Sequence, residues 1–196
     1  MHLHIFSCGL LAIIMVGNSF AFAQSVFSDL SVNNRNYTAI MALQSKGIIS
    51  GYPDGSFQPE RTVNRAEALK MITLTAQSVQ KMLDNPGKQA SITFPDIETS
   101  AWYMPYLKLA MSYDVVKGYP DGFFRPEKTV NLVESLKMAL EASEIDLSKI
   151  SVKENPYADA FMDQWYAKYV EYARRNGLIY ADGKNMIYPN QGMKRG

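Results

Sequence analysis

Apolar positions recur every three or four residues in three segments of this chain, the spacing that places side chains on one face of an α-helix. The first stripe is interrupted by Gly47, which can end a helix in a left-handed cap. A short helix cannot bury such a stripe alone, so each helix is expected to pack against its neighbours. The three stripes are Ala39, Ile40, Leu43 and Ile48; Trp102, Tyr106, Leu107, Ala110 and Met111; and Trp165, Tyr169, Val170 and Ala173.

A second kind of helix is predicted after Asn64-x-x-Glu67 and after Asn131-x-x-Glu134, because an apolar run follows each motif. Asn at an N-cap accepts hydrogen bonds from the free amides of the first turn, and Glu three residues later reaches back to the N-cap amide. The pattern therefore reads helix, long loop, helix.

The long loop between the two helices contains Tyr52-Pro53-Asp54-Gly55, which suits a type I turn because Pro presets the second position. The same four letters return at residues 119–122. Phe57 and Phe124 follow the two turns and are expected to hold the loops against the helices.

An internal duplication is the strongest signal in the sequence. GYPDGSFQPERTVNRAEALKMI, starting at Gly51, matches GYPDGFFRPEKTVNLVESLKMA, starting at Gly118, at 15 of 22 positions. The same spacing aligns Phe27-x-Asp29 with Phe94-x-Asp96. The whole helix-loop-helix unit is therefore repeated.

A third, diverged copy carries Tyr157-x-Asp159 in the place of Phe27-x-Asp29, and it keeps Pro189 and Arg195 while its GYPDG element is scrambled. Gly196 falls opposite Ala66, so we expect the third copy to be incomplete and to stop where the others enter their second helix. The three units are predicted at residues 27–93, 94–156 and 157–196.

The N-terminal segment has the features of a cleaved signal peptide spanning residues 1–23. An apolar run ends in Ala21-Phe22-Ala23, which places small residues where a signal peptidase reads them. The segment lacks Lys and Arg, which leaves an uncleaved membrane anchor as the alternative. No later segment is apolar and long enough to span a bilayer, so the mature chain is expected to be secreted.

Composition excludes several chemistries from the mature chain. His2, His4 and Cys8 are the only His and Cys residues, and all precede the predicted cleavage site. Catalysis by Ser-His-Asp or Cys-His groups, zinc sites built on His or Cys, and disulfides are therefore not expected. With 20 Lys and Arg against 19 Asp and Glu, the net charge of +1 does not favour nucleic acid as a partner.

Arg65 is the residue that the helical pattern does not explain. It occupies the first position of a predicted helix, where the helix dipole disfavours a cation and neither capping nor core packing requires one. A guanidinium beside free backbone amides forms an anion site. Arg65 is therefore the first candidate for ligand binding.

These elements in this order, Phe-x-Asp, an aromatic-led helix, Gly-Ile-Ile, GYPDG-x-Phe-x-Pro and Asn-Arg-Ala-Glu-Ala, resemble the S-layer homology repeat across residues 27–196. The resemblance implies an all-α fold of three helical-hairpin repeats, packed as a pseudo-threefold bundle with long loops. It also implies a non-catalytic module without a cofactor, which anchors exported proteins at the cell surface by binding cell-wall polysaccharide or a peptidoglycan-linked polymer, often one bearing pyruvate ketals.

The family's binding motif, Thr-Arg-Ala-Glu, places its Arg against a carboxylate in a groove between repeats. By resemblance, Asn64, Arg65 and Glu67 form the best candidate site, helped by Gly51, Tyr52 and Asp54 in the loop. Lys194 and Arg195 keep the cation in the third repeat but lack the family's Glu. Leu132 replaces the cation in the second repeat, so that groove is expected to be degenerate.

The sequence is compatible with two other functions. The degenerate copies are compatible with a structural surface-layer protein that self-associates into a lattice. A glycan hydrolase would need a pair of carboxylates, for which Asp54, Glu67, Asp121 and Glu134 are the candidates, but each also has a role as a turn or capping residue. No metal is expected, because neither Asp-Gly loop has the alternating ligands of an EF-hand.

Overall fold

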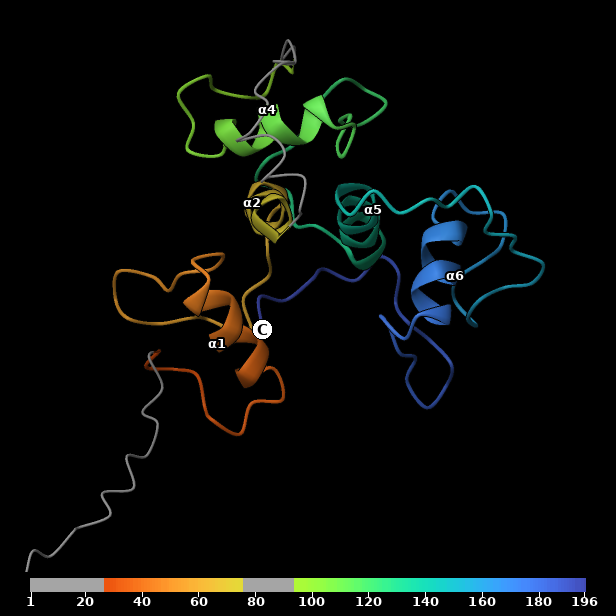
Figure 1. Ribbon diagram of the computed structural model, residues 1–196, viewed down its shortest axis with the longest axis horizontal. Helices are drawn as coiled ribbons and strands as arrows, with labels where there is room; N and C mark the ends of the chain where they lie inside the picture. Colours follow the sequence, from red (N-terminus) through yellow and green to blue (C-terminus); the bar gives the residue numbers. More distant parts are fainter. Residues whose placement is uncertain (1–26, 76–93) are drawn as a thin grey trace, which may run out of the picture.

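The computed structural model describes residues 27–75 and 94–196, and the predicted signal peptide lies outside the described residues. Figure 1 shows five labelled helices joined by long loops: α1 (Tyr37–Ser45), α2 (Arg65–Thr75), α4 (Met104–Ser112), α5 (Leu132–Ala142) and α6 (Ala167–Arg175). The described part of the chain contains isolated β-bridges but no strand. The prediction of a helical fold is confirmed. Among these helices, none combines the length and the apolar character that a bilayer crossing requires.

The first helix of each copy ends in the same way. Gly47 has a φ of 68° two residues after the end of α1, and Gly177 has a φ of 63° two residues after the end of α6. Asp114 takes this position after α4 with a φ of 58°, a conformation that Asp tolerates better than most residues. The left-handed cap predicted from Gly47 is thus present in all three copies.

A carboxylate from the start of each copy holds the long loop in place. Asp96 accepts hydrogen bonds from the backbone amides of Phe124 and Arg125 at 2.9 and 2.6 Å. Asp29 and Asp159 make the equivalent pairs of bonds to the loops of the first and third copies. This pair of hydrogen bonds explains why the aromatic-x-Asp motif recurs with each loop.

Replacing Asp96 with Asn should destabilise the fold by about 1–3 kcal/mol, because an amide offers one acceptor oxygen and turns its own donors toward an amide N–H. The measurement is the free energy of unfolding in urea. Asp114→Asn is the matched control, because Asp114 is exposed and makes only an i,i+3 ion pair with Lys117. The control should lie within about 0.5 kcal/mol of the parent chain; equal losses in both variants would contradict the role of Asp96.

Each loop covers a hydrophobic cluster through one buried side chain. Phe57 and Phe124 are fully buried and contact Phe27 and Phe94 at ring-centroid distances of 5.1 and 5.6 Å. Ile187 is buried at the same position of the third loop. The predicted pinning of the loops by Phe57 and Phe124 agrees with this packing.

The expectation that Trp102 and Trp165 belong to the buried stripes is wrong. Trp102 is 52% exposed and Trp165 is 55% exposed, and each lies edge-on to the following Tyr. The residues that point inward at this end of the helices are instead Tyr103 and Tyr166. The helical spacing is as predicted, but the buried stripes of the second and third copies begin one residue later, at Tyr103 and Tyr166.

The three copies meet through a closed ring of backbone hydrogen bonds. The amide of Val63 donates to Met193, the amide of Met193 donates to Val130, and the amide of Val130 donates to Val63, at 2.9 to 3.0 Å. Beside this ring, α2 packs against α4 and α5, and α5 also packs against α6. The start of each second helix is thereby placed beside the loop of another copy.

Candidate functional site

Arg65 lines a groove built from all three copies. The first copy contributes Arg65, the second contributes its loop and α5, and the third contributes Trp165. The groove has a volume of about 540 Å³. We call it the Arg65 groove; its lining residues are Arg65, Val115, Val116, Lys117, Gly118, Tyr119, Pro120, Glu134, Lys137, Met138 and Trp165.

The guanidinium of Arg65 is buried without a counter-ion. Arg65 is only 7% exposed, and its guanidinium carbon lies 4.9 Å from the ring centre of Tyr119 and 5.1 Å from that of Phe124. Its Nη1 approaches the sulfur of Met138 at 3.9 Å, whereas its Nε is buried with no hydrogen-bond partner. No carboxylate in residues 27–75 and 94–196 forms an ion pair with it. Burial of an unpaired cation is costly, so this geometry favours an anionic ligand.

The backbone fixes where the Arg65 side chain begins. The amides of Arg65 and Ala66 donate to the carbonyls of Lys128 and Pro126 in the second loop, at 2.9 and 3.0 Å. The predicted capping is confirmed: Asn64 accepts from the amide of Glu67 at 2.8 Å, and Glu67 accepts from the amide of Asn64 at 3.0 Å. Asn64 and Glu67 therefore support the helix start that carries Arg65.

Glu134 is the one carboxylate that lines the Arg65 groove, and its partners lie elsewhere. It accepts from the hydroxyl of Tyr119 at 2.7 Å, from the amide of Asn131 at 3.2 Å and from Lys128 at 3.3 Å. Burial acts to raise the pKa of Glu134, but these hydrogen bonds and the charge of Lys128 outweigh it and hold the pKa below its ordinary value. Glu134 therefore stays ionised and fixes the ring of Tyr119 beneath Arg65.

The lowered pKa of Glu134 predicts a pH-dependent contribution to stability. A carboxyl group whose pKa is lower in the folded chain stabilises the fold above its unfolded pKa, near 4.5, and loses that contribution as the pH falls through the folded value. Glu134→Gln should therefore be less stable than the parent chain at pH 6, and the difference should shrink by pH 3. Urea unfolding at the two pH values measures it. A difference that stays constant would show that the charge of Glu134 does not contribute.

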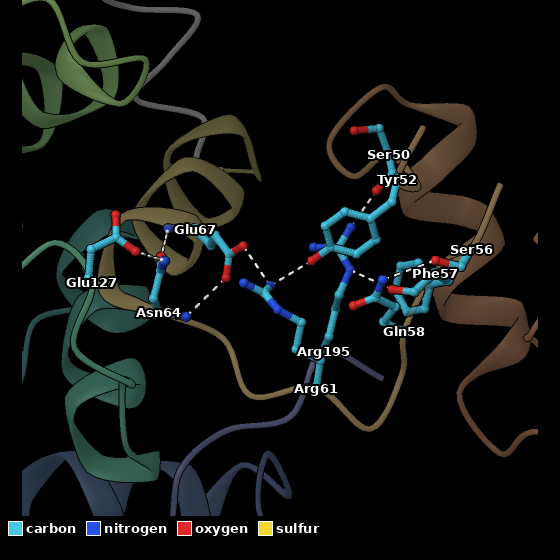
Figure 2. A network of polar contacts seen from close by, with 10 residues as sticks. All are labelled: Ser50, Tyr52, Ser56, Phe57, Gln58, Arg61, Asn64, Glu67, Glu127 and Arg195. Carbon is cyan, nitrogen blue, oxygen red and sulfur yellow. Dashed lines mark hydrogen bonds and ion pairs between the residues drawn. The ribbon is translucent and has the colours of Figure 1, made fainter. Parts of the chain in front are cut away.

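A second groove of the same composition surrounds Arg195, and we call it the Arg195 groove. It lies against the first loop and α2, with Trp102 in the place of Trp165, and its volume is about 220 Å³. Figure 2 shows Arg195 beside the ring of Tyr52. The Nε of Arg195 donates to the carbonyl of Phe57 at 2.9 Å, and its Nη2 donates to the carbonyl of Ser50. The guanidinium of Arg195 thus already donates hydrogen bonds to backbone oxygens of the chain.

Figure 2 also shows how the wall of this groove is held. Arg61 pairs with Glu67 at 2.7 Å and donates to the hydroxyl of Tyr52 at 2.5 Å. Lys128 makes the same two contacts in the second copy, to Glu134 and to Tyr119. The two grooves therefore share one framework and differ in whether the central guanidinium is free.

The structure separates residues that the sequence placed in one site. Gly51, Tyr52 and Glu67 line the Arg195 groove, not the Arg65 groove. The loop that faces Arg65 belongs to the second copy, where Gly118 and Tyr119 take these places.

The other predicted residues make local contacts. Asp54 accepts from the amide and hydroxyl of Ser56 within the exposed turn. Lys194 forms an ion pair with Glu60 at the surface. Asn64, besides capping α2, donates through its side-chain amide to Glu127 at 2.7 Å. None of these contacts points to a ligand.

The third loop keeps its shape although its sequence is scrambled. Asn185 adopts a φ of 58° where the other loops have Gly55 and Gly122, and its amide donates to Asp182 as theirs donate to Tyr52 and Tyr119. Asp182 thus takes the position of Tyr52 and Tyr119 in the other two loops. Opposite this loop, Leu132 takes the position that Arg65 and Arg195 have in the other two copies. Leu132 packs against the apolar cluster of the third copy.

Several groove residues were missed because each also has an ordinary role in packing. Tyr119 and Phe124 support Arg65 from below, and Lys137 lies 5.7 Å above the ring centre of Trp165. The signal that could have found them is the repeat itself. Each of these residues recurs in the first or second copy, as Tyr52, Phe57, Lys70 and Trp102.

Comparison with known proteins gives a consistent result. The S-layer homology domain matches residues 27–69, 93–132 and 156–196. The cell surface glycoprotein 1 of Acetivibrio thermocellus is 31% identical over 153 residues, which cover 71% of this chain and 6% of that protein. The cellulosome-anchoring protein of the same species is 30% identical over 149 residues, or 75% of this chain and 32% of that protein.

A third relative comes from another species. The surface-layer 125 kDa protein of Lysinibacillus sphaericus is 29% identical over 165 residues, which cover 80% of this chain and 13% of that protein. The chain therefore spans a third or less of the length of each of these three relatives.

Proposed function

Because this chain belongs to the S-layer homology family, we propose that it is a non-catalytic module that binds an anionic cell-wall polysaccharide at the bacterial surface. The names of its relatives, a cellulosome-anchoring protein and a surface-layer protein, support a role in anchoring. Export through cleavage after Ala23 remains a prediction that fits this location.

The observation that carries the proposal is the unpaired guanidinium of Arg65. A carboxylate in the Arg65 groove would accept from the guanidinium of Arg65 and supply the missing counter-charge. A pyruvate ketal suits the groove, because its carboxylate would face Arg65 and its methyl group would lie toward Met138. The exposed ring of Trp165 offers a flat surface for the sugar.

The repeats are proposed to pack around a pseudo-threefold axis, with units at residues 27–93, 94–156 and 157–196. The closed ring of hydrogen bonds through Val63, Val130 and Met193 supports this arrangement. Each groove would then lie between one copy's guanidinium and the next copy's loop. Such grooves require the copies to be joined, so an isolated repeat would not bind.

A hydrolase is less well supported. Hydrolysis of a glycosidic bond needs one carboxyl group whose pKa is raised, so that it can donate a proton. The pKa of Glu134 and that of Asp54 are instead lowered by the hydrogen bonds that they accept. Glu67 is held by Arg61 and by its own helix cap.

Self-association into a surface lattice is the second candidate function. The observation that favours it is the exposure of large apolar side chains on the third copy, Phe161, Met162 and Trp165. Light scattering with and without soluble wall polymer separates the two functions. For a lattice-forming protein the particle size should increase without polymer, whereas a simple anchor should remain monodisperse.

The direct test of the proposed function is co-sedimentation with purified cell wall, compared with the same wall after chemical removal of its anionic polymer. We expect the protein to bind the intact wall and to remain in solution with the stripped wall. Soluble pyruvylated fragments should compete, and the same fragments after removal of pyruvate should not. Equal binding to both walls would overturn the proposal.

A further inference from the structure

The Arg65 groove contains a second cation that no carboxylate neutralises. Lys117 and Lys137 line the groove together with Arg65. Lys117 forms an ion pair with Asp114 at 3.3 Å. Lys137, like Arg65, forms no ion pair with a carboxylate of residues 27–75 and 94–196. One bound carboxylate would therefore neutralise Arg65 and leave the charge of Lys137 without a counter-ion.

Two carboxylates of α5 occupy the helical positions that usually pair with a Lys, yet neither pairs with Lys137. Glu134 comes three residues before Lys137 and Glu141 comes four residues after it, the spacings at which ion pairs form on a helix. Glu134 is instead held by Lys128 and by the cap of α5. Glu141 accepts from the hydroxyl of Tyr169 on α6 at 2.6 Å. The charge of Lys137 is thereby left available to a ligand in the groove.

The amine of Lys137 lies at the ring that is proposed to receive the sugar. Its Nζ is 5.7 Å from the ring centre of Trp165, and Trp165 is 55% exposed. The groove volume of about 540 Å³ is within the range of pockets that enclose a whole small molecule. A sugar against Trp165 would therefore bring its substituents close to Nζ of Lys137.

The equivalent Lys of the Arg195 groove provides a comparison. Lys70 lines that groove, and its Nζ lies 6.0 Å from the ring centre of Tyr106. There the central guanidinium already donates to the carbonyls of Phe57 and Ser50. Of these two grooves, the Arg65 groove is therefore the one that offers a ligand two cations without partners.

We propose that Lys137 is a second anion-binding residue of the Arg65 groove, and that the preferred ligand is a sugar unit with two acidic groups. One carboxylate would bind Arg65, and a second acidic group, either a carboxylate or a phosphate, would bind Lys137. An ammonium group is a compact charge that accepts both kinds of partner, whereas a guanidinium favours planar, two-pronged contacts. This inference rests on the proposed function and specifies the class of polymer that the groove selects.

The test is calorimetric titration of the whole chain with three soluble probes. The first is a pyruvylated hexosamine with one carboxylate, the second is the same sugar linked to glucuronic acid, and the third is the same sugar with a phosphate monoester. At least one of the two doubly acidic probes should bind at least fivefold more tightly than the first, and the tighter one identifies the second acidic group. Lys137→Gln should reduce this preference to less than twofold, and Lys137→Arg should retain it.

Lys70→Gln is the matched control, because it removes the same charge at the equivalent position of the Arg195 groove, and it should leave the preference unchanged. Arg65→Leu should weaken the binding of all three probes, because it removes the contact that they share. Equal affinities of the three probes for the parent chain, or an unchanged preference in Lys137→Gln, would overturn the role of Lys137 and leave the anchoring function standing. If the parent chain binds none of the probes, the proposed function is wrong and the second anion site is wrong with it.

Discussion

Replacing Arg65 with Leu should abolish most wall binding while leaving the fold as stable as before or more stable. A guanidinium–carboxylate pair contributes about 1.5–3 kcal/mol, so affinity should fall roughly 10- to 150-fold. The same change removes an unpaired buried cation, so the free energy of unfolding should not fall. The second copy already carries Leu132 at this position, which shows that the fold accepts Leu there. Co-sedimentation and urea unfolding measure the two effects.

Arg195→Leu is the matched control, and it should give the opposite result. Arg195 donates to the carbonyls of Phe57 and Ser50, so its loss leaves these acceptors unpaired and should cost about 1–3 kcal/mol of stability. Wall binding should change by less than about threefold when it is measured at a temperature and pH at which the variant is fully folded. If the two variants lose binding equally, the distinction between the free and the occupied guanidinium is wrong.

Replacing Phe124 with Ala should produce the largest loss of stability. Its side chain is fully buried between Phe94, Tyr103 and the guanidinium of Arg65. Removing a buried Phe ring typically costs about 3–5 kcal/mol, because apolar burial is lost and a cavity remains. For a chain of this size the midpoint of thermal unfolding should fall by roughly 6–20 °C.

Phe123→Ala is the control beside it. Phe123 is 40% exposed at the preceding position, and the first copy has Ser56 there. Its replacement should change stability by less than about 0.5 kcal/mol. A loss of similar size in the two variants would show that the loop is not held through Phe124.

The local features of the fold could be predicted because they depend on neighbouring residues. The cap formed by Asn131 and Glu134, and the left-handed residue at Gly47, follow from backbone chemistry within one turn. The third loop escaped prediction because Asn185 can adopt the conformation of a Gly, so the loop kept its shape without its sequence signature.

The arrangement of the site could not be predicted in the same way, because it depends on which copy faces which. The sequence suggested Arg65 as the free cation, but it placed Arg65 with Gly51 and Tyr52, which line the Arg195 groove instead. The difference between Arg65 and Arg195 rests on the positions of two backbone carbonyls. No residue type encodes those positions.

The most direct measurement is a crystal structure of the chain with a pyruvylated disaccharide from the wall polymer. We expect one ligand in the Arg65 groove, with its carboxylate within hydrogen-bond distance of the guanidinium of Arg65 and its sugar against Trp165. The Arg195 groove should remain empty, because its guanidinium already donates to the carbonyls of Phe57 and Ser50. A ligand bound elsewhere, with the guanidinium of Arg65 still lacking a counter-ion, would contradict the proposed mechanism of anchoring.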